Sequence, residues 1–175
     1  MNCPYCNAWN IEGADTCESC GQELTVLEKP EVGSLMEASI MESHLSRLNP
    51  KKPVFATEET SVAQAINQLR DRGIGCLLIG SEERLSGVFS ERDALIRIRD
   101  RYEEASDFPV SSFMATRVET LDIETPIAFA LNRMAMGNIR HLPVTRKGII
   151  AGIISLRDIL RFMSDWYPDL IEAEV

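Results

Sequence analysis

The second half of the chain repeats the first at a constant offset of 65 residues, and this duplication restricts its possible folds more than any other feature. Identical residues recur at this offset without a gap, and conservative pairs such as Val62 with Ile127 lie between them. Among the identical pairs are Glu59 and Glu124, Thr60 and Thr125, Ala65 and Ala130, Asn67 and Asn132, Ile74 and Ile139, Leu77 and Leu142, Gly87 and Gly152, Ser90 and Ser155, Arg92 and Arg157, Asp93 and Asp158, and Leu95 and Leu160. Regular self-similarity is the signature of a fold built from repeated structural units. We therefore predict two copies of one fold from about residue 51 onward.

Each copy shows the same succession of strand and helix patterns. An extended piece leads to a helix that begins near Thr60 or Thr125, and in the second copy Pro126 is placed just inside the helix start, where its missing N–H costs nothing. The helix ends near Gly73 or Asn138, since both residues tolerate a left-handed backbone. An apolar strand, a polar turn, a strand that ends at the repeated serine and a closing helix follow. The order β-α-β-β-α predicts an α+β fold in which two sheets pack together under outer helices.

Composition and the duplication together divide the chain into five segments. They are a cysteine-rich arm at 1–24, a linker and lead-in helix at 25–50, a first repeat at 51–105, a second repeat at 106–168 and an acidic tail at 169–175. The lead-in helix is predicted because apolar residues recur at helical spacing and Asn49 and Pro50 end the pattern. The residues of its apolar face are Ile40, Met41, His44, Leu45 and Leu48.

The amino-acid composition is that of an ordinary globular protein, with 45% hydrophobic and 26% charged residues. No apolar run approaches the roughly 20 residues that span a bilayer, and the first ten residues do not resemble a secretory signal. The net charge of −9 argues against a large nucleic-acid surface, although a small phosphate-bearing ligand needs only local donors. We therefore expect a cytoplasmic protein that contacts neither membrane nor nucleic acid.

Four of the five cysteines form two Cys-x-x-Cys pairs in the first twenty residues, with ten residues between the pairs. A Cys-x-x-Cys turn directs two thiolates at one point, and two such turns complete a tetrahedral metal site. The alternatives are disulfides, which a reducing compartment disfavours, and a redox-active pair, which normally occurs once beside a βαβ unit. The prediction is one structural zinc ion, the usual metal for four thiolates. Its ligands would be Cys3, Cys6, Cys17 and Cys20.

This array resembles the zinc-ribbon family, in which the metal is structural and the module often contacts a protein or a nucleic acid. Residues 1–30 carry five acidic residues against Lys29 alone, so nucleic acid is disfavoured as a partner. A contact with an unknown protein partner through Trp9 or Tyr5 is favoured instead. The alternative is that Trp9 merely covers the small metal core.

The segments Gly87–Asp93 and Gly152–Asp158 carry the duplicated Gly-x-x-Ser-x-Arg-Asp pattern. Serine followed by an acidic residue three positions later is the pattern of a capping box at a helix start. The same helix start offers free N–H groups to an anion, and the arginine can add phosphate donors. An ionised aspartate can accept hydrogen bonds from two ribose hydroxyls. Both interpretations, a helix cap and a ligand site, stay open from the residues alone.

The span from about 35 to 168 resembles a tandem pair of CBS domains, an arrangement called a Bateman module. The second repeat carries the motifs of that family in Thr125-Pro126-Ile127, His141-Leu142-Pro143-Val144, Gly152, Ser155 and Asp158. The first repeat departs from them with Ser61 in place of the helix-start proline and with no proline in its strand. The resemblance implies two repeats packed by pseudo-twofold symmetry, with two clefts that bind an adenosine ligand.

In this family, each cleft takes its helix-start threonine and strand backbone from one repeat and its serine and aspartate from the other. One cleft would contain Thr60, Ala65, Ile74, Gly75 and Cys76 with Ile153, Ser155, Arg157 and Asp158. The other would contain Thr125, Ala130, Ile139, Arg140 and His141 with Val88, Ser90, Arg92 and Asp93. Apolar residues would enclose the adenine, backbone groups would bind its edge, and the aspartate would bind the ribose. Arg140 can reach a phosphate, so the second cleft is expected to bind more tightly, whereas His141 is either a packed strand residue or a ligand contact.

No constellation for covalent or hydrolytic chemistry is visible, because the two histidines lie in different motifs and no serine has a visible base partner. The sequence therefore predicts a non-catalytic regulatory module, a homodimer that senses an adenine nucleotide and signals to a partner protein. The dimer is expected because apolar residues around Leu95–Ile98 and Leu156–Met163 are poorly covered within one pair. The alternatives are an interaction scaffold with empty clefts and, less favoured, a nucleic-acid-associated protein.

Overall fold

A computed structural model describes residues 3, 6, 8–11, 14–22, 24 and 35–165 of the chain. The predicted linker at 25–33, Tyr5 and the acidic tail lie outside the described residues. The chain divides into two compact units that interleave along the sequence. Unit 1 comprises Met1–Pro50, Leu121–Leu142 and Ile154–Val175, and unit 2 comprises Lys51–Thr120 and Pro143–Ile153. Each unit is described by itself.

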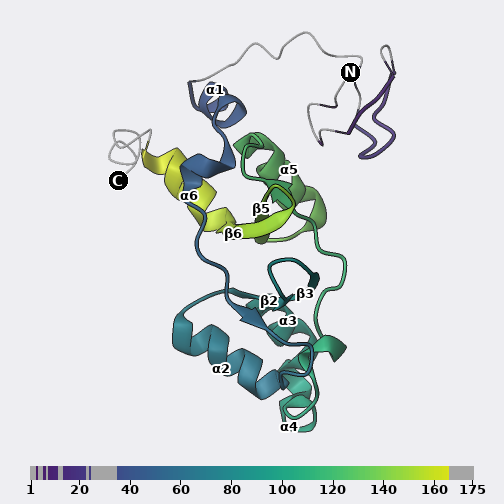
Figure 1. Cartoon of the computed structure of the whole chain (residues 1–175), viewed down its shortest axis with the longest axis vertical. Helices are drawn as coiled ribbons and strands as arrows, with labels where there is room; N and C mark the ends of the chain where they lie inside the picture. Colours follow the sequence, from purple (N-terminus) through teal and green to yellow (C-terminus); the bar gives the residue numbers. More distant parts are fainter. Residues whose placement is uncertain are drawn as a thin grey trace. The chain divides into compact units, whose positions relative to one another are not determined.

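The first repeat forms a three-stranded sheet in unit 2, with the strand order β1-β2-β3. The strands are β1 (Phe55–Ala56), β2 (Cys76–Gly80) and β3 (Leu85–Ser90). β1 pairs with β2 in parallel, and β2 pairs with β3 antiparallel, so that Cys76 lies opposite Ser90. Helix α2 (Val62–Arg72) lies against this sheet (Figure 1) and contributes Val62, Ala65 and Leu69 to the core below it.

Local signals fix both ends of α2. The Ser61 side chain accepts a hydrogen bond from the Gln64 N–H, and the Gln64 side chain accepts one from the Ser61 N–H, which makes a capping box. Gly73 ends the helix with a positive φ of 60°, as predicted, because glycine adopts this conformation without a steric penalty.

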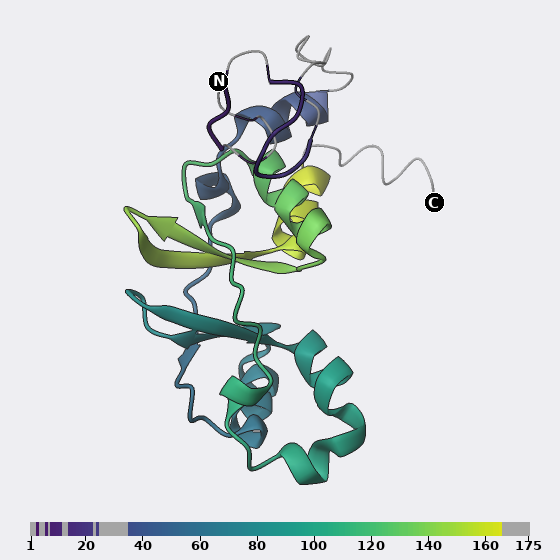
Figure 2. The ribbon, with the colours of Figure 1, turned by 90° about the vertical axis from the view of Figure 1, so that its right-hand side faces the viewer.

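The second repeat forms another three-stranded sheet, with the strand order β4-β5-β6. Its strands are β4 (Leu121–Asp122), β5 (His141–Arg146) and β6 (Ile149–Ser155), and its helices are α5 (Ile127–Gly137) and α6 (Leu156–Asp165). Helices α5 and α6 pack against each other (Figure 2). The mixed α+β class with two small sheets is confirmed, as are the strand ends at Ser90 and Ser155.

The start of α5 differs from the prediction. Pro126 is the residue before the helix rather than the first residue inside it, with an extended backbone at φ −59° and ψ 145°. It is held there because its backbone forms a bridge with His44, and the Ile127 N–H donates to the Ser43 carbonyl at 2.8 Å. Asn138 ends α5 with a φ of 49°, as predicted.

The predicted single lead-in helix is wrong, because the structure has two segments. Helix α1 (Leu35–Glu42) is followed by the 3₁₀ segment η1 (Leu45–Leu48), and His44 between them is extended. The Leu45 and Ser46 N–H groups donate to the Thr125 and Ile123 carbonyls, so the chain here pairs with a neighbouring segment instead of continuing the helix. Met41 and His44 are exposed and are not on the buried face.

The closing helix of the first repeat begins at Glu91 as predicted, but it is not continuous. Its pieces are α3 (Glu91–Asp93), the π-helical segment η2 (Ala94–Ile98), the 3₁₀ segment η3 (Arg99–Arg101) and α4 (Tyr102–Ala105). The 3₁₀ segment η4 (Val110–Ser112) follows α4.

The core of unit 2 lies between α2, the sheet and the pieces of the closing helix. Its buried residues are Ala56, Val62, Ala65, Leu69, Leu77, Ile79, Phe89, Ile98, Ala105 and Val110. In unit 1, buried residues come from η1, α5, β5, β6 and α6, among them Leu45, Ile127, Ala130, Met134, Leu142, Ile154 and Ile159. Among the described residues, no helix combines the length and the apolar character needed to cross a bilayer.

Candidate functional site

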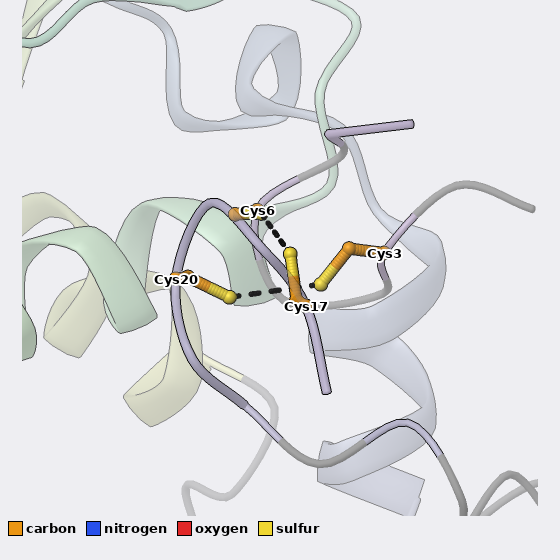
Figure 3. A group of neighbouring side chains, drawn as sticks. All are labelled: Cys3, Cys6, Cys17 and Cys20. Carbon is orange, nitrogen blue, oxygen red and sulfur yellow. Dashed lines mark hydrogen bonds between the residues drawn. The ribbon is translucent and has the colours of Figure 1, made fainter. Parts of the chain in front are cut away.

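The cysteine-rich arm brings its four thiols together (Figure 3). The sulfur atoms of Cys3, Cys6, Cys17 and Cys20 all lie within 4.8 Å of one another, and two of the pairs are 3.5 and 3.7 Å apart. Four sulfurs at the usual zinc distance of about 2.3 Å in a tetrahedron lie about 3.8 Å apart. The spacing and the donor set therefore fit a four-thiolate zinc site, as the sequence predicts.

Backbone bonds hold this arrangement. The Cys17 N–H donates to the Gln22 carbonyl at 2.8 Å, and the Gly21 N–H donates to the Cys17 carbonyl at the same distance. Gly21 has a φ of 71°, which favours glycine at the end of the Cys-x-x-Cys-Gly turn.

The role of Asn10 in the arm was not predicted from the sequence. Its buried side-chain amide donates to the Ala8 carbonyl at 2.8 Å and to the Cys17 sulfur at 3.4 Å, as the outer neighbours of metal ligands commonly do.

The thiols differ in acidity. Burial raises the pKa of Cys17, but hydrogen bonds from the Cys20 and Ser19 N–H groups and from Asn10 outweigh it and lower the pKa to about 6. Burial, together with the nearby thiols, raises the pKa of Cys20 to about 12. At neutral pH without metal, the arm therefore combines a thiolate with a thiol, and a bound cation would favour deprotonation of both.

The duplicated serine and aspartate form the same pair of hydrogen bonds in both repeats. We call this bonded pair, Ser90 with Asp93 or Ser155 with Asp158, the lock of its repeat. In the first repeat, one oxygen of Asp93 (Oδ2) accepts from the Ser90 N–H at 3.0 Å and from the Ser90 hydroxyl at 2.6 Å. In the second, Oδ2 of Asp158 accepts from the Ser155 N–H at 2.8 Å and from its hydroxyl at 2.6 Å. The Asp93 N–H also points at the Ser90 hydroxyl oxygen at 3.4 Å, which completes a capping box. The cap that the sequence suggests is therefore present.

The start of each apolar strand lies beside the lock of its own repeat. The Gly75 carbonyl accepts from the Glu91 N–H at 3.1 Å, and the Arg140 carbonyl accepts from the Leu156 N–H at 2.9 Å. These two bonds are equivalent under the 65-residue offset. Cys76 is buried, and burial and the negative charge of Asp93 raise the pKa of its thiol, so Cys76 is neutral.

The remaining predicted site residues lie in several environments. Cys76, Val88 and Ile153 are brought together in one apolar cluster of unit 2, which also includes Leu78 and Ile150. Ala65 and Ala130 are fully buried, and the Thr60 hydroxyl oxygen accepts from the Thr57 N–H at 3.1 Å. Ile74, Thr125, Ile139, His141 and Arg92 are half-buried, and Arg140 and Arg157 are exposed. The predicted pairing of unit 1 residues with unit 2 residues in each cleft stays a prediction.

Arg97 is a neighbour of the first lock that sequence reasoning missed. Its guanidinium lies 3.5 Å from Oδ1 of Asp93 and donates to the carbonyls of Phe113 and Met114 at 2.8 and 3.2 Å. The signal was present in the sequence, because residues four apart on a helix are neighbours. Residue 162, at the equivalent place in the second repeat, is phenylalanine.

Comparison with known proteins gives a consistent result. A family model described as the CBS domain matches residues 39–100 and 110–165. The CBS domain-containing protein CBSCBSPB1 of Arabidopsis thaliana is 29% identical over 125 residues, which are 71% of this chain but 22% of that protein. An A-adding tRNA nucleotidyltransferase of Aquifex aeolicus is 29% identical over 115 residues, or 65% of this chain and 14% of the enzyme. The chain therefore spans only a fraction of the length of these relatives.

Among solved structures, a CBS domain protein of Pyrobaculum aerophilum complexed with AMP is similar, with a TM-score of 0.60 and 25% sequence identity. The similarity covers 70% of this chain and 99% of that chain.

Proposed function

The chain belongs to the CBS-domain family, and we propose on this premise that it is a regulatory module that binds an adenosine ligand such as AMP, ADP or ATP. Binding would change a surface that a partner protein recognises, and the module itself would catalyse no reaction. The AMP complex of the Pyrobaculum aerophilum relative supports an adenosine ligand.

The observation that carries the proposal is the matched orientation of two carboxylates. In each repeat the serine N–H and hydroxyl both donate to the same carboxylate oxygen, Oδ2, which holds that oxygen at the start of the closing helix. A carboxylate has about four acceptor positions, which suits an aspartate to accept hydrogen bonds from ribose hydroxyls. Asp93 and Asp158 are the residues that we assign to ribose.

The other residues proposed for the ligand sites are those that the family resemblance implies. They are Thr60, Ala65, Ile74, Gly75, Cys76, Ile153, Ser155 and Arg157 for one ligand, and Thr125, Ala130, Ile139, Arg140, His141, Val88, Ser90 and Arg92 for the other. The exposed guanidinium of Arg140 supports a phosphate contact there, and the buried alanines would act by leaving space rather than by direct contact.

Calorimetric titration of AMP and ATP into the zinc-loaded chain tests this proposal. Asp93→Ala and Asp158→Ala should each weaken one binding event by about ten- to hundredfold, because each removes a charge-assisted hydrogen bond worth roughly 1.5–3 kcal/mol. The control is Asp71→Ala, which removes an exposed carboxylate paired only locally with Arg70 and should leave binding unchanged.

An interaction scaffold without ligand is the second candidate, and the hydrogen bonds between serine and aspartate in each repeat favour it, since both residues already serve a structural purpose. On this alternative, the wild type binds neither nucleotide, and both aspartate variants lose only about 0.5–2 kcal/mol of stability.

We also propose that the four thiolates bind one structural zinc ion. The thiol spacing supports this, and a module this small has little other core, so its folding should depend on the metal, whose binding is worth about 10–16 kcal/mol in comparable peptides. Elemental analysis of protein purified without chelator should give about one zinc per chain. Its absence, or its retention in a Cys3→Ser/Cys17→Ser variant, would contradict the assignment.

Homodimerisation is the remaining part of the proposal. Leu95 and Ile96 on η2 are 64% and 68% exposed, and Leu160 on α6 is 55% exposed, which supports association through these helices. Light scattering at tens of micromolar should give the mass of a dimer, and a monomer would contradict this part alone.

A further inference from the structure

Two large apolar side chains of the cysteine-rich arm point away from its core. Trp9 is 73% exposed and Ile11 is 66% exposed, whereas Asn10 between them is 4% exposed and bonds to the Cys17 sulfur. In an extended segment, alternate side chains lie on opposite sides. Because Asn10 faces the thiols, Trp9 and Ile11 share the outward side and form one surface, the Trp9–Ile11 edge.

The Trp9–Ile11 edge does not belong to the core of the arm. Among the described residues, that core consists of Cys3, Cys17 and Leu24, with Cys6, Ala8, Ala14 and Cys20 packed against it. The thiols are therefore covered without Trp9, and the alternative that Trp9 merely covers the metal core is wrong. An indole exposed on so small a module is typical of a protein contact, where tryptophan is a preferred anchor.

The residues near the Trp9–Ile11 edge are acidic, and this charge indicates which kind of partner can bind there. Asp15 and Glu18 are exposed, and the Ala14 N–H donates to the Ile11 carbonyl at 3.1 Å, so Asp15 directly follows a turn that begins at the edge itself. Residues 1–28 contain no lysine or arginine at all. The acidic surroundings disfavour a phosphate backbone or an anionic membrane and favour a cationic partner.

We infer that the Trp9–Ile11 edge is the docking site for a basic peptide segment of a partner protein. An arginine or lysine of such a segment can place its cation over the indole face of Trp9. Its aliphatic stem can pack on Ile11 while neighbouring cations face Asp15 and Glu18. The partner is thus defined by alternating cationic and aliphatic side chains. This inference does not depend on nucleotide binding by the repeats.

The test uses the full zinc-loaded chain and fluorescence anisotropy of a labelled peptide that alternates arginine with valine. The double variant Trp9→Ser/Ile11→Ser should bind this peptide about tenfold more weakly, as expected when a central aromatic anchor is lost. Asp15→Asn/Glu18→Gln should bind it about threefold more weakly and with less salt dependence.

Met136→Ser is the matched control, because Met136 is an equally exposed apolar residue outside the arm, at 63%. It should bind like the wild type, and every variant should retain the wild-type zinc content. The inference is overturned if the Trp9→Ser/Ile11→Ser variant binds the peptide as tightly as the wild type. It is also overturned if a glutamate–valine peptide or an oligouridine RNA binds as tightly as the arginine peptide, or if self-association of the chain requires Trp9.

Discussion

The two repeats share their locks but differ in the helix that comes after each lock. Ser90 and Asp93 form nearly the same hydrogen bonds as Ser155 and Asp158. Beyond the lock, however, the first repeat continues into the π-helical segment η2, whereas the second continues into the unbroken α6. Duplication has therefore preserved the orientation of one carboxylate in each repeat and has left the adjoining helix free to diverge. The preserved part is the part to which we assign ligand binding.

The helices before the locks also begin by different means. In the first repeat, Ser61 caps α2 with its hydroxyl, whereas in the second the chain before α5 is fixed by the rigid ring of Pro126 and by the bridge to His44. Ser61 and Pro126 end the extended segment at equivalent positions, so each helix begins at the same place in its repeat. Departures from a family motif can thus leave the architecture intact.

The largest expected effect tests whether the two repeats have equivalent cores. Leu77 and Leu142 are equivalent under the offset, and both have no exposed surface. Leu77→Ala and Leu142→Ala should each lower the free energy of unfolding by about 2–5 kcal/mol, because each change leaves a cavity among the buried side chains around the leucine. Urea denaturation measures both values.

Met136→Ala is the control, since this methionine is 63% exposed and its truncation should change stability by less than about 0.5 kcal/mol. If only one of the two leucine variants lowers the free energy of unfolding by less than about 1 kcal/mol, the two cores are not equivalent.

A smaller effect is expected at Gly87, which belongs to the duplicated motif. A Cβ atom at this position would come within 3.0 Å of the Ala115 carbonyl oxygen and closer still to the Met114 side chain. This glycine is therefore required because the segment after η4 pairs with β3, where the Val88 and Ala115 backbones exchange two hydrogen bonds. Gly87→Ala should destabilise unit 2 by about 1–3 kcal/mol.

Gly137→Ala provides the opposite expectation. Gly137 is the last residue of α5, and an added Cβ would meet Ile139 only at ordinary contact distances of 3.5 Å or more. This variant should be stabilised by about 0.5–1 kcal/mol, since alanine loses less conformational entropy than glycine. Equal thermal unfolding of the two glycine variants would show that Met114 and Ala115 do not constrain Gly87.

The sequence predicts the features that depend on local pattern and duplication. The strand ends at Ser90 and Ser155, the left-handed helix ends at Gly73 and Asn138 and the convergence of the four thiols all follow from residue type and spacing. Each of these features involves residues that determine their own backbone or that repeat at the constant offset.

The features that could not be predicted depend on contacts between distant segments. The lead-in helix breaks at His44 because the Leu45 and Ser46 N–H groups find partners about 80 residues away, at Thr125 and Ile123. The apolar spacing of 35–48 fits one helix equally well, so periodicity alone carries no sign of the break. The outward direction of Trp9 likewise follows from Asn10 turning inward toward Cys17, which composition does not indicate.

The smallest effect is expected for Arg97, whose charge lies beside the first lock and has no counterpart at position 162 of the second repeat. Arg97→Phe gives the first repeat the residue that stands at position 162 in the second. The change removes an ion pair with Asp93 whose side chains are 46% and 17% exposed, and it also removes two hydrogen bonds to the Phe113 and Met114 carbonyls. A partly solvated pair is worth about 0.2–1 kcal/mol after screening, and the carbonyls can bond to water instead. We therefore expect a loss of about 1 kcal/mol.

Urea denaturation at low and high salt separates the contributions to this loss, because only the ion pair is screened. The destabilisation of Arg97→Phe should shrink at high salt, and Arg97→Lys should retain the salt-sensitive part while losing the forked contact with the two carbonyls. If Arg97→Phe instead costs as much as Leu77→Ala, the guanidinium holds the segment at 113–114 as part of the fold. The divergence after the two locks would then be structural in origin rather than a difference in local charge.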